Sequence, residues 1–556
     1  MNRWKPLVPL GAAQFLVVLD TSVMNVSISR LVEDFQTDIA AIQATITLYT
    51  LVMAAFLITG SKVGDILGRR RTFAIGLVVY GIGSGLTAVA PTLWVLVLGW
   101  SVIEGLGGAL VLPALAALVG GSYSGRERAV AYGVIGGLAG AGIAVGPLLG
   151  GWVTTYLTWR LVFAGEVVVV LLILLMLRWI GDVPTCGPRR RLDAVGAALS
   201  VVGLGLVVLG VLQSGTWGWL TPRDPPFTVF GFAPTLFVVT AGLVVLGLLR
   251  GWLRHREAQG RDPLVRSALF DVRPLRAALS TLLAQNLILL GLFFTIPLYL
   301  QVVQGFNAFE TGLRLLPVSI TMLVTSMSAP LLNRIAGPRL VVRVGFGVLV
   351  VATLWLLAGI EPQIDDASFA AAMAVLGIGM GLLAGQLGNV AQSAVGETDR
   401  SEVGGLQYTA QNLGSSLGTA LIGSVLVGAL ASAAQGGVAA AAGVSEPVKQ
   451  QVGIVIEGGI SFVPTEQVRA ALTQAGIPSD EVDALTAAYA DAQLQGLKVA
   501  LLAAAGTALL SLFLTRELPR ARRSADSPAV PAGPPPGGES GQADRSGALP
   551  PRTRRT

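Results

Sequence analysis

Three acidic residues stand inside otherwise apolar segments in the first third of the chain. Asp20 lies about halfway along residues 7–27, and Glu104 and Glu166 lie in two later apolar segments. A carboxyl group in such surroundings is costly, so it usually faces a cavity or a partner. It can also take up and release protons near neutral pH. These residues are therefore candidates for moving protons, and a structural acid bonded to a neighbouring helix is the alternative interpretation of Asp20.

The composition places these acids in a protein that crosses a membrane many times. The 556 residues are 53% hydrophobic and only 13% charged, whereas soluble domains average about 25% charged residues. A single cysteine, Cys186, and a single histidine, His255, exclude an internal disulfide framework and a Cys-rich or His-rich metal site. The sequence has no G-x-x-x-x-G-K-[ST] phosphate-binding loop. We therefore expect no cofactor, no bound metal and no enzyme activity.

About fourteen segments are long and apolar enough to cross a membrane, which takes about 20 residues. The even-numbered connections between them hold far more Arg and Lys than the odd-numbered ones. Because basic loops stay in the cytoplasm, we expect both termini on that side, with basic residues near lipid headgroups rather than nucleic acid. The predicted segments are 7–27, 42–60, 73–91, 94–119, 129–153, 161–180, 193–213, 228–249, 277–302, 311–331, 341–360, 367–392, 403–430 and 497–515.

The order of these segments predicts an all-α polytopic membrane protein with two six-helix bundles and two inserted helices. We assign residues 1–180 to the first bundle and 181–276 to a linker with the two additional helices. Residues 277–515 form the second bundle and include a polar external loop at 431–496, with helix-like stretches around Thr465–Ala475 and Ser479–Gln495. Residues 516–556 are rich in Pro, Gly, Ser and Arg, which predicts a disordered cytoplasmic tail.

The fifth segment is rich in glycine and ends in a G-P-x-x-G-G pattern. Each glycine inside a helix costs about 1 kcal/mol relative to alanine. In a membrane, however, glycine lets two helices approach closely, and a proline is tolerated. A generic helix-packing face is the alternative interpretation. The residues concerned are Gly142, Gly146, Pro147, Gly150 and Gly151.

A charged motif, GSKVGDILGRRRT, connects the second and third segments. Asp65 is followed at short spacing by Gly68, Arg69 and Arg70. Arginines alone would be explained by the excess of basic residues in cytoplasmic loops. The Gly-Asp and Gly-Arg-Arg spacing favours a more specific role.

These two motifs, with LDTSVMNVSI around Asp20 and SVIEGLGGALVLPALAAL on the fourth segment, resemble the fourteen-span drug:proton antiporter family of the major facilitator superfamily. The resemblance covers about residues 5–430 and 497–515. It implies the major facilitator fold and proton-driven efflux of amphipathic small molecules across the plasma membrane by alternating access, and we expect a working monomer. Export of an endogenous metabolite, lipid or siderophore is the alternative, and a non-transporting membrane sensor is a remote one.

The resemblance also assigns roles to the motif residues. It implies that the Asp65 motif latches the cytoplasmic gate, and that the glycine-rich segment seals the pathway and favours exchange over leak. The chain departs from the family where Ser101 stands in place of an Arg often assigned to proton coupling. Glu104 and Glu166 stand where the family has amides. We therefore expect proton coupling at Asp20 and at least one of Glu104 and Glu166.

Amide side chains are the main polar groups inside the apolar segments of the second half. Gln407 and Gln411 share one helix face because they are four residues apart. They could hydrogen-bond a substrate from the side opposite the first half, and hydrogen bonding between helices is the alternative interpretation. The predicted substrate-binding residues are Asn25, Gln285, Asn286, Gln407 and Gln411.

Overall fold

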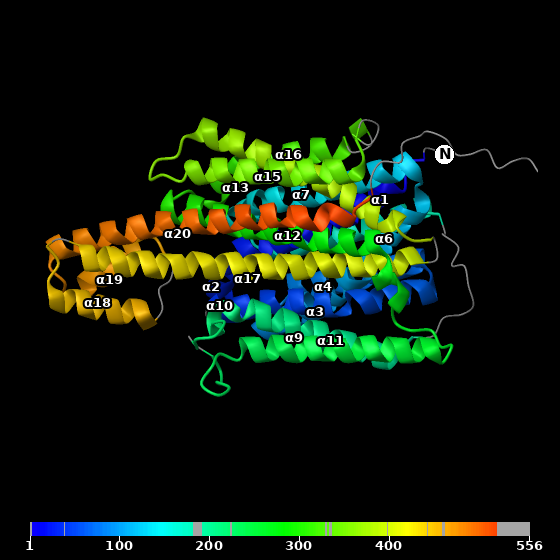
Figure 1. Cartoon of the computed structure of the whole chain (residues 1–556), viewed down its shortest axis with the longest axis horizontal. Coiled ribbons are helices and arrows are strands. Elements are labelled where there is room, and N and C mark those ends of the chain that lie inside the picture. Colours follow the sequence, from blue (N-terminus) through cyan, green and yellow to red (C-terminus); the bar gives the residue numbers. More distant parts are fainter. Residues whose placement is uncertain are drawn as a thin grey trace, which may run out of the picture. The chain divides into compact units, whose positions relative to one another are not determined.

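The computed structural model describes residues 3–519, except for 38, 182–191, 223–224, 329–330, 333–335, 397–398, 442 and 459–461. Most of this part of the chain is helical, and its only β-type pairing is an isolated bridge between Val229 and Phe232 (Figure 1). The expected all-α fold is confirmed. Most of the predicted tail, from residue 520 onwards, lies outside the described residues, as does Cys186.

The first bundle follows the first six predicted segments closely, because each run of about 20 apolar residues becomes one long helix. The short helix α2 (Ile28–Phe35) connects the first two. The six are α1 (Leu7–Val26), α3 (Ile39–Leu67), α4 (Arg69–Ala88), the continuous run of α5 (Leu93–Leu96), η1 (Val97–Glu104) and α6 (Gly105–Ser122), α7 (Gly125–Tyr156), and α8 (Arg160–Met176) followed by η2 (Leu177–Trp179).

The remaining segments supply the inserted pair and the second bundle. Asp193 caps the first inserted helix, where its carboxylate accepts a hydrogen bond of 3.0 Å from the amide of Gly196. The inserted helices are α9 (Ala194–Leu212) and α11 (Thr235–Ala258), joined through α10 (Ser214–Trp217). After η3 (Ser267–Asp271) the second bundle contains α12 (Arg273–Leu298) with η4 (Tyr299–Val303), α13 (Ala308–Met327), α15 (Pro338–Ala358), α16 (Asp366–Ser393), α17 (Arg400–Ala440) and α20 (Ser479–Leu514), which ends in η6 (Thr515–Glu517).

Thirteen helices in the described part of the chain are long and apolar enough to cross a membrane. The remaining predicted segment, 311–331, is the tenth along the chain and corresponds to α13, which falls outside that set. α13 nevertheless packs against α16 and α7, so the expected arrangement of about fourteen helices holds.

Two large groups of buried apolar side chains lie among the helices. One lies mainly within the first bundle, and the other lies mainly within the second bundle and extends to α9 and α11. α9 and α11 pack against each other, and α9 also contacts α3 and α17. The bundles meet mainly where α7 packs against α13 and α16, and where α17 packs against α3 and α6. A pathway between the bundles would therefore be bordered by α7 and α17.

Ionic contacts place the two ends of the described chain at the same end of the bundles. Arg3 pairs with Glu127 at the start of α7, and Arg400 at the start of α17 donates to the carbonyl of Gly120 at 3.0 Å. At the start of α12, Arg276 pairs with Glu517 at 3.2 Å. We call this the terminal end of the bundles.

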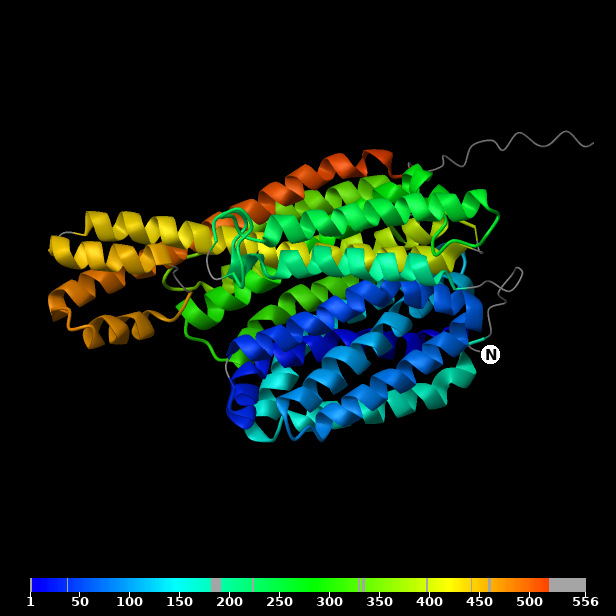
Figure 2. The same cartoon turned by 90° about the horizontal axis from the view of Figure 1, so that it is seen from below.

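The region 431–496, expected as a polar loop, is a helical extension of the second bundle. α17 runs on to Ala440 and α20 already begins at Ser479, so both continue past the limits of predicted segments 13 and 14. α18 (Glu446–Gly458) and α19 (Thr465–Gln474) lie between them. Figures 1 and 2 show these yellow and orange helices projecting beyond the bundles, away from the terminal end. The alanine-rich sequence favours helix even where it is polar, which explains why the membrane helices do not stop at the predicted boundaries.

Candidate functional site

The three predicted acids meet in one place. Asp20 comes from α1, Glu104 from the end of η1 and Glu166 from α8, and one carboxylate oxygen of each lies within 4.8 Å of the others. All three are buried, with exposed fractions of 0%, 0% and 2%. Among the described residues, no Arg or Lys forms an ion pair with any of them. We call these three residues the carboxyl cluster.

Ser84 on α4 joins the two glutamates. Its Oγ lies 2.9 Å from Oε2 of Glu104 and 2.8 Å from Oε2 of Glu166, both hydrogen-bonding distances. A serine hydroxyl has only one proton to donate. If Ser84 donates to one carboxylate, the other carboxyl group must be protonated and donate to Ser84. The geometry therefore requires at least one proton on the Glu104–Glu166 pair.

Asp20 is held by an aromatic pair. The indole Nε1 of Trp100 donates to both carboxylate oxygens of Asp20, at 2.9 and 3.0 Å. The Trp100 ring stacks on Tyr49, with ring centres 4.7 Å apart. By contrast, Oε1 of Glu104 and Oε1 of Glu166 are buried without a hydrogen-bond partner. Asp20 thus has a stable donor, whereas the two glutamates keep one buried oxygen each for an incoming proton.

A π-helical turn and close glycine packing position the cluster. η1 is π-helical from Val97 to Glu104, and such turns often occur at functional sites. At Gly83, a Cβ atom would lie 2.6 Å from the amide nitrogen of Glu104. Only glycine lets α4 and η1 approach this closely, and this contact brings the next residue, Ser84, to the glutamates.

Sequence reasoning missed Ser84, Trp100 and the π-helical turn. The signals were weak: Ser84 is the one polar residue in the run GIGSG, and Trp100 is the nearest aromatic before Glu104. Ser101, which replaces the family's arginine, donates through Oγ to the carbonyl of Thr45 at 2.8 Å. It therefore ties η1 to α3 and adds no charge to the cluster.

The same oxygen atoms could in principle ligate a hard cation. Carboxylate oxygens suit Mg²⁺ and Ca²⁺, which take six to eight ligands in all. Ser84 already engages one oxygen of each glutamate, and the indole of Trp100 engages both oxygens of Asp20. This bonding suits proton sharing better than a metal, and the absence of a metal stays a prediction.

The glycines of the predicted antiporter motif pack α7 against the helix that carries Asp20. Cβ atoms added at Gly142, Gly146 and Gly150 would lie 3.0, 2.2 and 3.0 Å from side-chain atoms of Val18, Ser22 and Val23 on α1. Gly151 is also buried. Pro147 lies within the continuous helix α7, and its side chain is outside the described part. Earlier glycines on α7 face the second bundle instead, as at Gly133 against Ser326.

The predicted gate residues lie in the turn between α3 and α4. Gly68 has φ of +95°, a left-handed conformation that favours glycine. Arg69 is buried, and Asp65 and Arg70 are half-buried. An ion pair between the two bundles lies near this turn. Lys62 on α3 lies 3.6 Å from Glu402 on α17, with both side chains almost completely buried.

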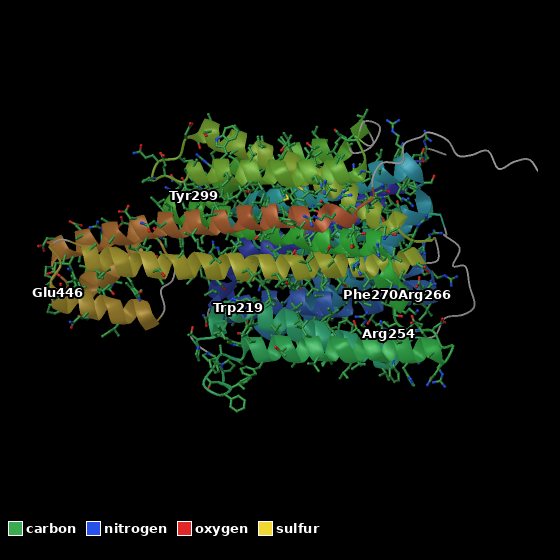
Figure 3. The ribbon with its side chains drawn as sticks, viewed as in Figure 1. Trp219, Arg254, Arg266, Phe270, Tyr299 and Glu446 are labelled. Atoms are coloured by element: carbon green, nitrogen blue, oxygen red, sulfur yellow. The ribbon has the colours of Figure 1, made fainter. Side chains whose placement is uncertain are left out.

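Arg266, in the connection before α12, completes this ionic cluster. It pairs with Asp399, and its backbone amide donates to Glu402 at 3.1 Å. Figure 3 shows Arg266 far from Glu446, which lies in the helical extension. We call Lys62, Arg266, Asp399 and Glu402 the ionic latch. Sequence reasoning missed it because its members lie up to 340 residues apart.

A second clamp lies at the opposite end of the first bundle. The indole of Trp159 donates to Asp34 at 2.7 Å, and Arg160 pairs with the same carboxylate at 2.9 Å. The hydrogen bond from Trp159, followed by the charge of Arg160, holds the pKa of Asp34 below its usual value. The stability from this contact is present at neutral pH and is lost as the pH falls through that lowered pKa.

The predicted substrate amides behave differently from one another. Gln285 on α12 and Gln407 on α17 are buried, and the side-chain oxygen of each has no hydrogen-bond partner. Asn286 instead donates to the carbonyl of Leu282 at 3.0 Å, a hydrogen bond within α12. Gln411 is half-buried, and the side chain of Asn25 lies outside the described part.

Comparisons with known proteins agree with this architecture. A family model described as Major Facilitator Superfamily matches residues 10–419. The chain is 32% identical to the puromycin resistance protein pur8 of Streptomyces alboniger over 437 residues, covering 78% of this chain and 83% of that protein. It is 28% identical over 542 residues to the multidrug resistance protein Stp of Mycobacterium tuberculosis (strain CDC 1551 / Oshkosh), covering 95% and 94%.

Solved structures show the same fold at low sequence identity. The human organic anion transporter MFSD10 (TETRAN) aligns with a TM-score of 0.55 and 14% identity, covering 93% of this chain and 100% of that one. The proton:xylose symporter XylE aligns with a TM-score of 0.53 and 12% identity, covering 88% and 94%. With the family model and the helical arrangement together, the protein is a multi-pass membrane transporter of small molecules rather than an enzyme, and it belongs to the major facilitator superfamily.

Proposed function

We propose that this transporter exports amphipathic small molecules across the plasma membrane by alternating access, in exchange for protons. The observation that carries the proposal is the carboxyl cluster, in which the hydroxyl of Ser84 bridges two buried glutamates. Similar proteins are named for resistance to puromycin, to lincomycin and to multiple drugs, and these names support the substrate class. A single chain contains both bundles, so we propose that the monomer is the working unit.

The proposed cycle assigns the proton to the carboxyl cluster and the substrate to the space between the bundles. Glu104 and Glu166 would share the proton through Ser84, and Asp20 would accept or release it on a helix that also contacts α7. The amides Gln285 and Gln407 would hydrogen-bond the substrate from the second bundle. Because α1 belongs to the first bundle and is packed against the glycines of α7, a change in cluster charge would alter how the two bundles meet.

The direct test is transport in reconstituted vesicles. Purified protein in proteoliposomes would be given an imposed pH gradient and a panel of fluorescent dyes and antibiotics. We expect substrate movement that depends on the gradient and stops when a protonophore collapses it. Transport that is unaffected by the protonophore, or by reversing the gradient, would contradict proton exchange.

We propose that both termini face the cytoplasm, because the basic connections lie at the terminal end. In a Cys186→Ser background, a cysteine at Arg261 should stay protected from an impermeant maleimide in intact cells. A cysteine at Gln474 in the helical extension should be labelled. Labelling at residue 261 with protection at residue 474 would show the opposite orientation in the membrane.

We propose that the ionic latch holds the bundles together at the cytoplasmic end. Lys62→Met removes a buried cation from Glu402 and should shift the equilibrium toward separated bundles by about tenfold or more, since breaking a buried pair costs several kcal/mol. Spin labels at Leu67 and Leu340, which are exposed near this end, would report longer distances in pulsed EPR. Arg71→Gln, which removes an exposed charge from the same end, is the control. Equal distance distributions in Lys62→Met and the parent would exclude a latching role.

A further inference from the structure

The helical extension beyond the second bundle has a core of its own. α17 has 41 residues and α20 has 36, so each is more than about 50 Å long, whereas a membrane core is about 30 Å thick. Their outer parts pack with α18 and α19 around buried side chains that include Leu430, Leu485 and Tyr489. These helices therefore form a small structure outside the membrane that remains rigidly attached to the transporter.

This extension contains a partly open cavity of about 510 Å³. It lies among α17, α18, α19 and α20, and its walls are largely aliphatic, as in Val438, Val452, Leu472 and Leu485. No Asp, Glu, Lys or Arg is among the described residues that line it. The volume lies in the range of about 300–1,000 Å³ that is typical of small-molecule sites, and apolar cavities of this kind accept apolar ligands.

The few polar side chains of the cavity are arranged at its edges. The hydroxyl of Tyr489 accepts a hydrogen bond from the amide of Val463 at 3.0 Å and also lies 3.2 Å from the carbonyl of the same residue. With its hydroxyl engaged, Tyr489 offers a ligand its ring. Gln451 and Gln467 are exposed, so their amides can meet a polar group at the rim.

We propose that this cavity binds the apolar part of an uncharged amphipathic small molecule, whose polar group lies at Gln451 and Gln467. A charged group inside would lose its hydration with no partner of opposite charge, which is strongly unfavourable. Two sources share this chemistry: a molecule of the exported class and a membrane lipid with a single acyl chain. The helices that form the cavity emerge directly from the second bundle, so either source can reach it.

Photo-crosslinking of the full-length protein in lipid nanodiscs tests the proposal. One arm uses a diazirine derivative of an uncharged aromatic dye, and the other uses a diazirine monoacylglycerol. We expect labelled peptides from residues 446–489, identified by mass spectrometry. Labelling by the dye points to a molecule of the exported class, and labelling only by the monoacylglycerol points to a lipid. Labelling of this region by neither probe would overturn the proposal.

Filling the cavity supplies the decisive control. Ala471→Trp places a large side chain on the cavity face of α19 and should lower labelling by about tenfold, because an overfilled cavity excludes its ligand. Ala470→Trp changes the preceding residue of the same helix, which is not in the cavity lining. This variant should be labelled to the same extent as the parent. Ala475→Trp provides a second filling variant if Ala471→Trp does not fold. Equal labelling of filled and parental protein would overturn the site. Binding is measured without transport, so this result and the export assay can fail independently.

Discussion

Replacing Asp20 by Asn, or Glu104 or Glu166 by Gln, should lower proton-coupled exchange by about 100-fold or more, the scale expected when a proton-transfer group is lost. Each change keeps the size of the side chain but removes a site that can gain and lose a proton. In proteoliposomes with an imposed pH gradient, these variants should still bind substrate while losing the response to the gradient. We expect the largest loss at Asp20, because it lies on α1, the helix that packs against the glycines of α7.

Two further variants separate proton sharing from general damage to the cluster. Ser84→Ala removes the hydroxyl that links the two glutamates and should impair exchange in the same direction. Glu33→Gln neutralises an acid with a 63% exposed side chain and should leave exchange at the parental rate. If all three cluster variants exchange at the parental rate, coupling lies elsewhere, and Asp65 becomes the next candidate.

Substituting Gly146 by Ala should abolish the coupled exchange of protons for substrate, while the protein still folds and binds substrate. A Cβ atom at this position would lie 2.2 Å from the Cβ atom of Ser22, so α7 and α1 must separate. Overpacking of this kind costs about 1–3 kcal/mol, and the displaced helix α1 also carries Asp20. We expect uncoupled proton leak, measured as loss of the pH gradient without substrate.

A second, compensating substitution tests whether this collision is the cause. Ser22→Gly in the Gly146→Ala background removes the atom that collides and should restore exchange. The added glycine inside a helix should lower the stability of the protein by about 1 kcal/mol. Gly347→Ala, on α15, is the matched control, because a Cβ atom there meets nothing within 4 Å. If Gly146→Ala transports normally, or if Ser22→Gly gives no rescue, the motif serves only as ordinary packing.

The distribution of glycines along α7 links these two predictions. Gly133, Gly137 and Gly140 approach α13 of the second bundle, whereas Gly146 and Gly150 approach α1. The glycines of this helix therefore approach the opposite bundle in its first half and the helix of Asp20 in its second half. Any movement of α7 relative to α1 would act near the carboxyl cluster and at the interface between the bundles.

The sequence alone determined the class of the protein and the position of its membrane helices. Apolar length and the clustering of basic loops are local properties, so they can be read without a structure. The same reading singled out Asp20, Glu104 and Glu166, because an acid inside an apolar run stands out at any position. It also singled out the glycines of α7, since their cost in a helix requires a packing reason.

Only the tertiary structure decided what these residues meet. Ser84 lies 82 residues before Glu166 and comes within 2.8 Å of it only because Gly83 lets α4 approach η1. Lys62 and Glu402 pair across the two bundles for a similar reason, since their contact depends on how α3 packs against α17. The ends of α17 and α20 in the helical extension could not be predicted from the sequence. A polar, alanine-rich helix has no hydropathy signal to mark where the membrane ends. Contacts between distant helices arise from packing geometry, which no local pattern of residues encodes.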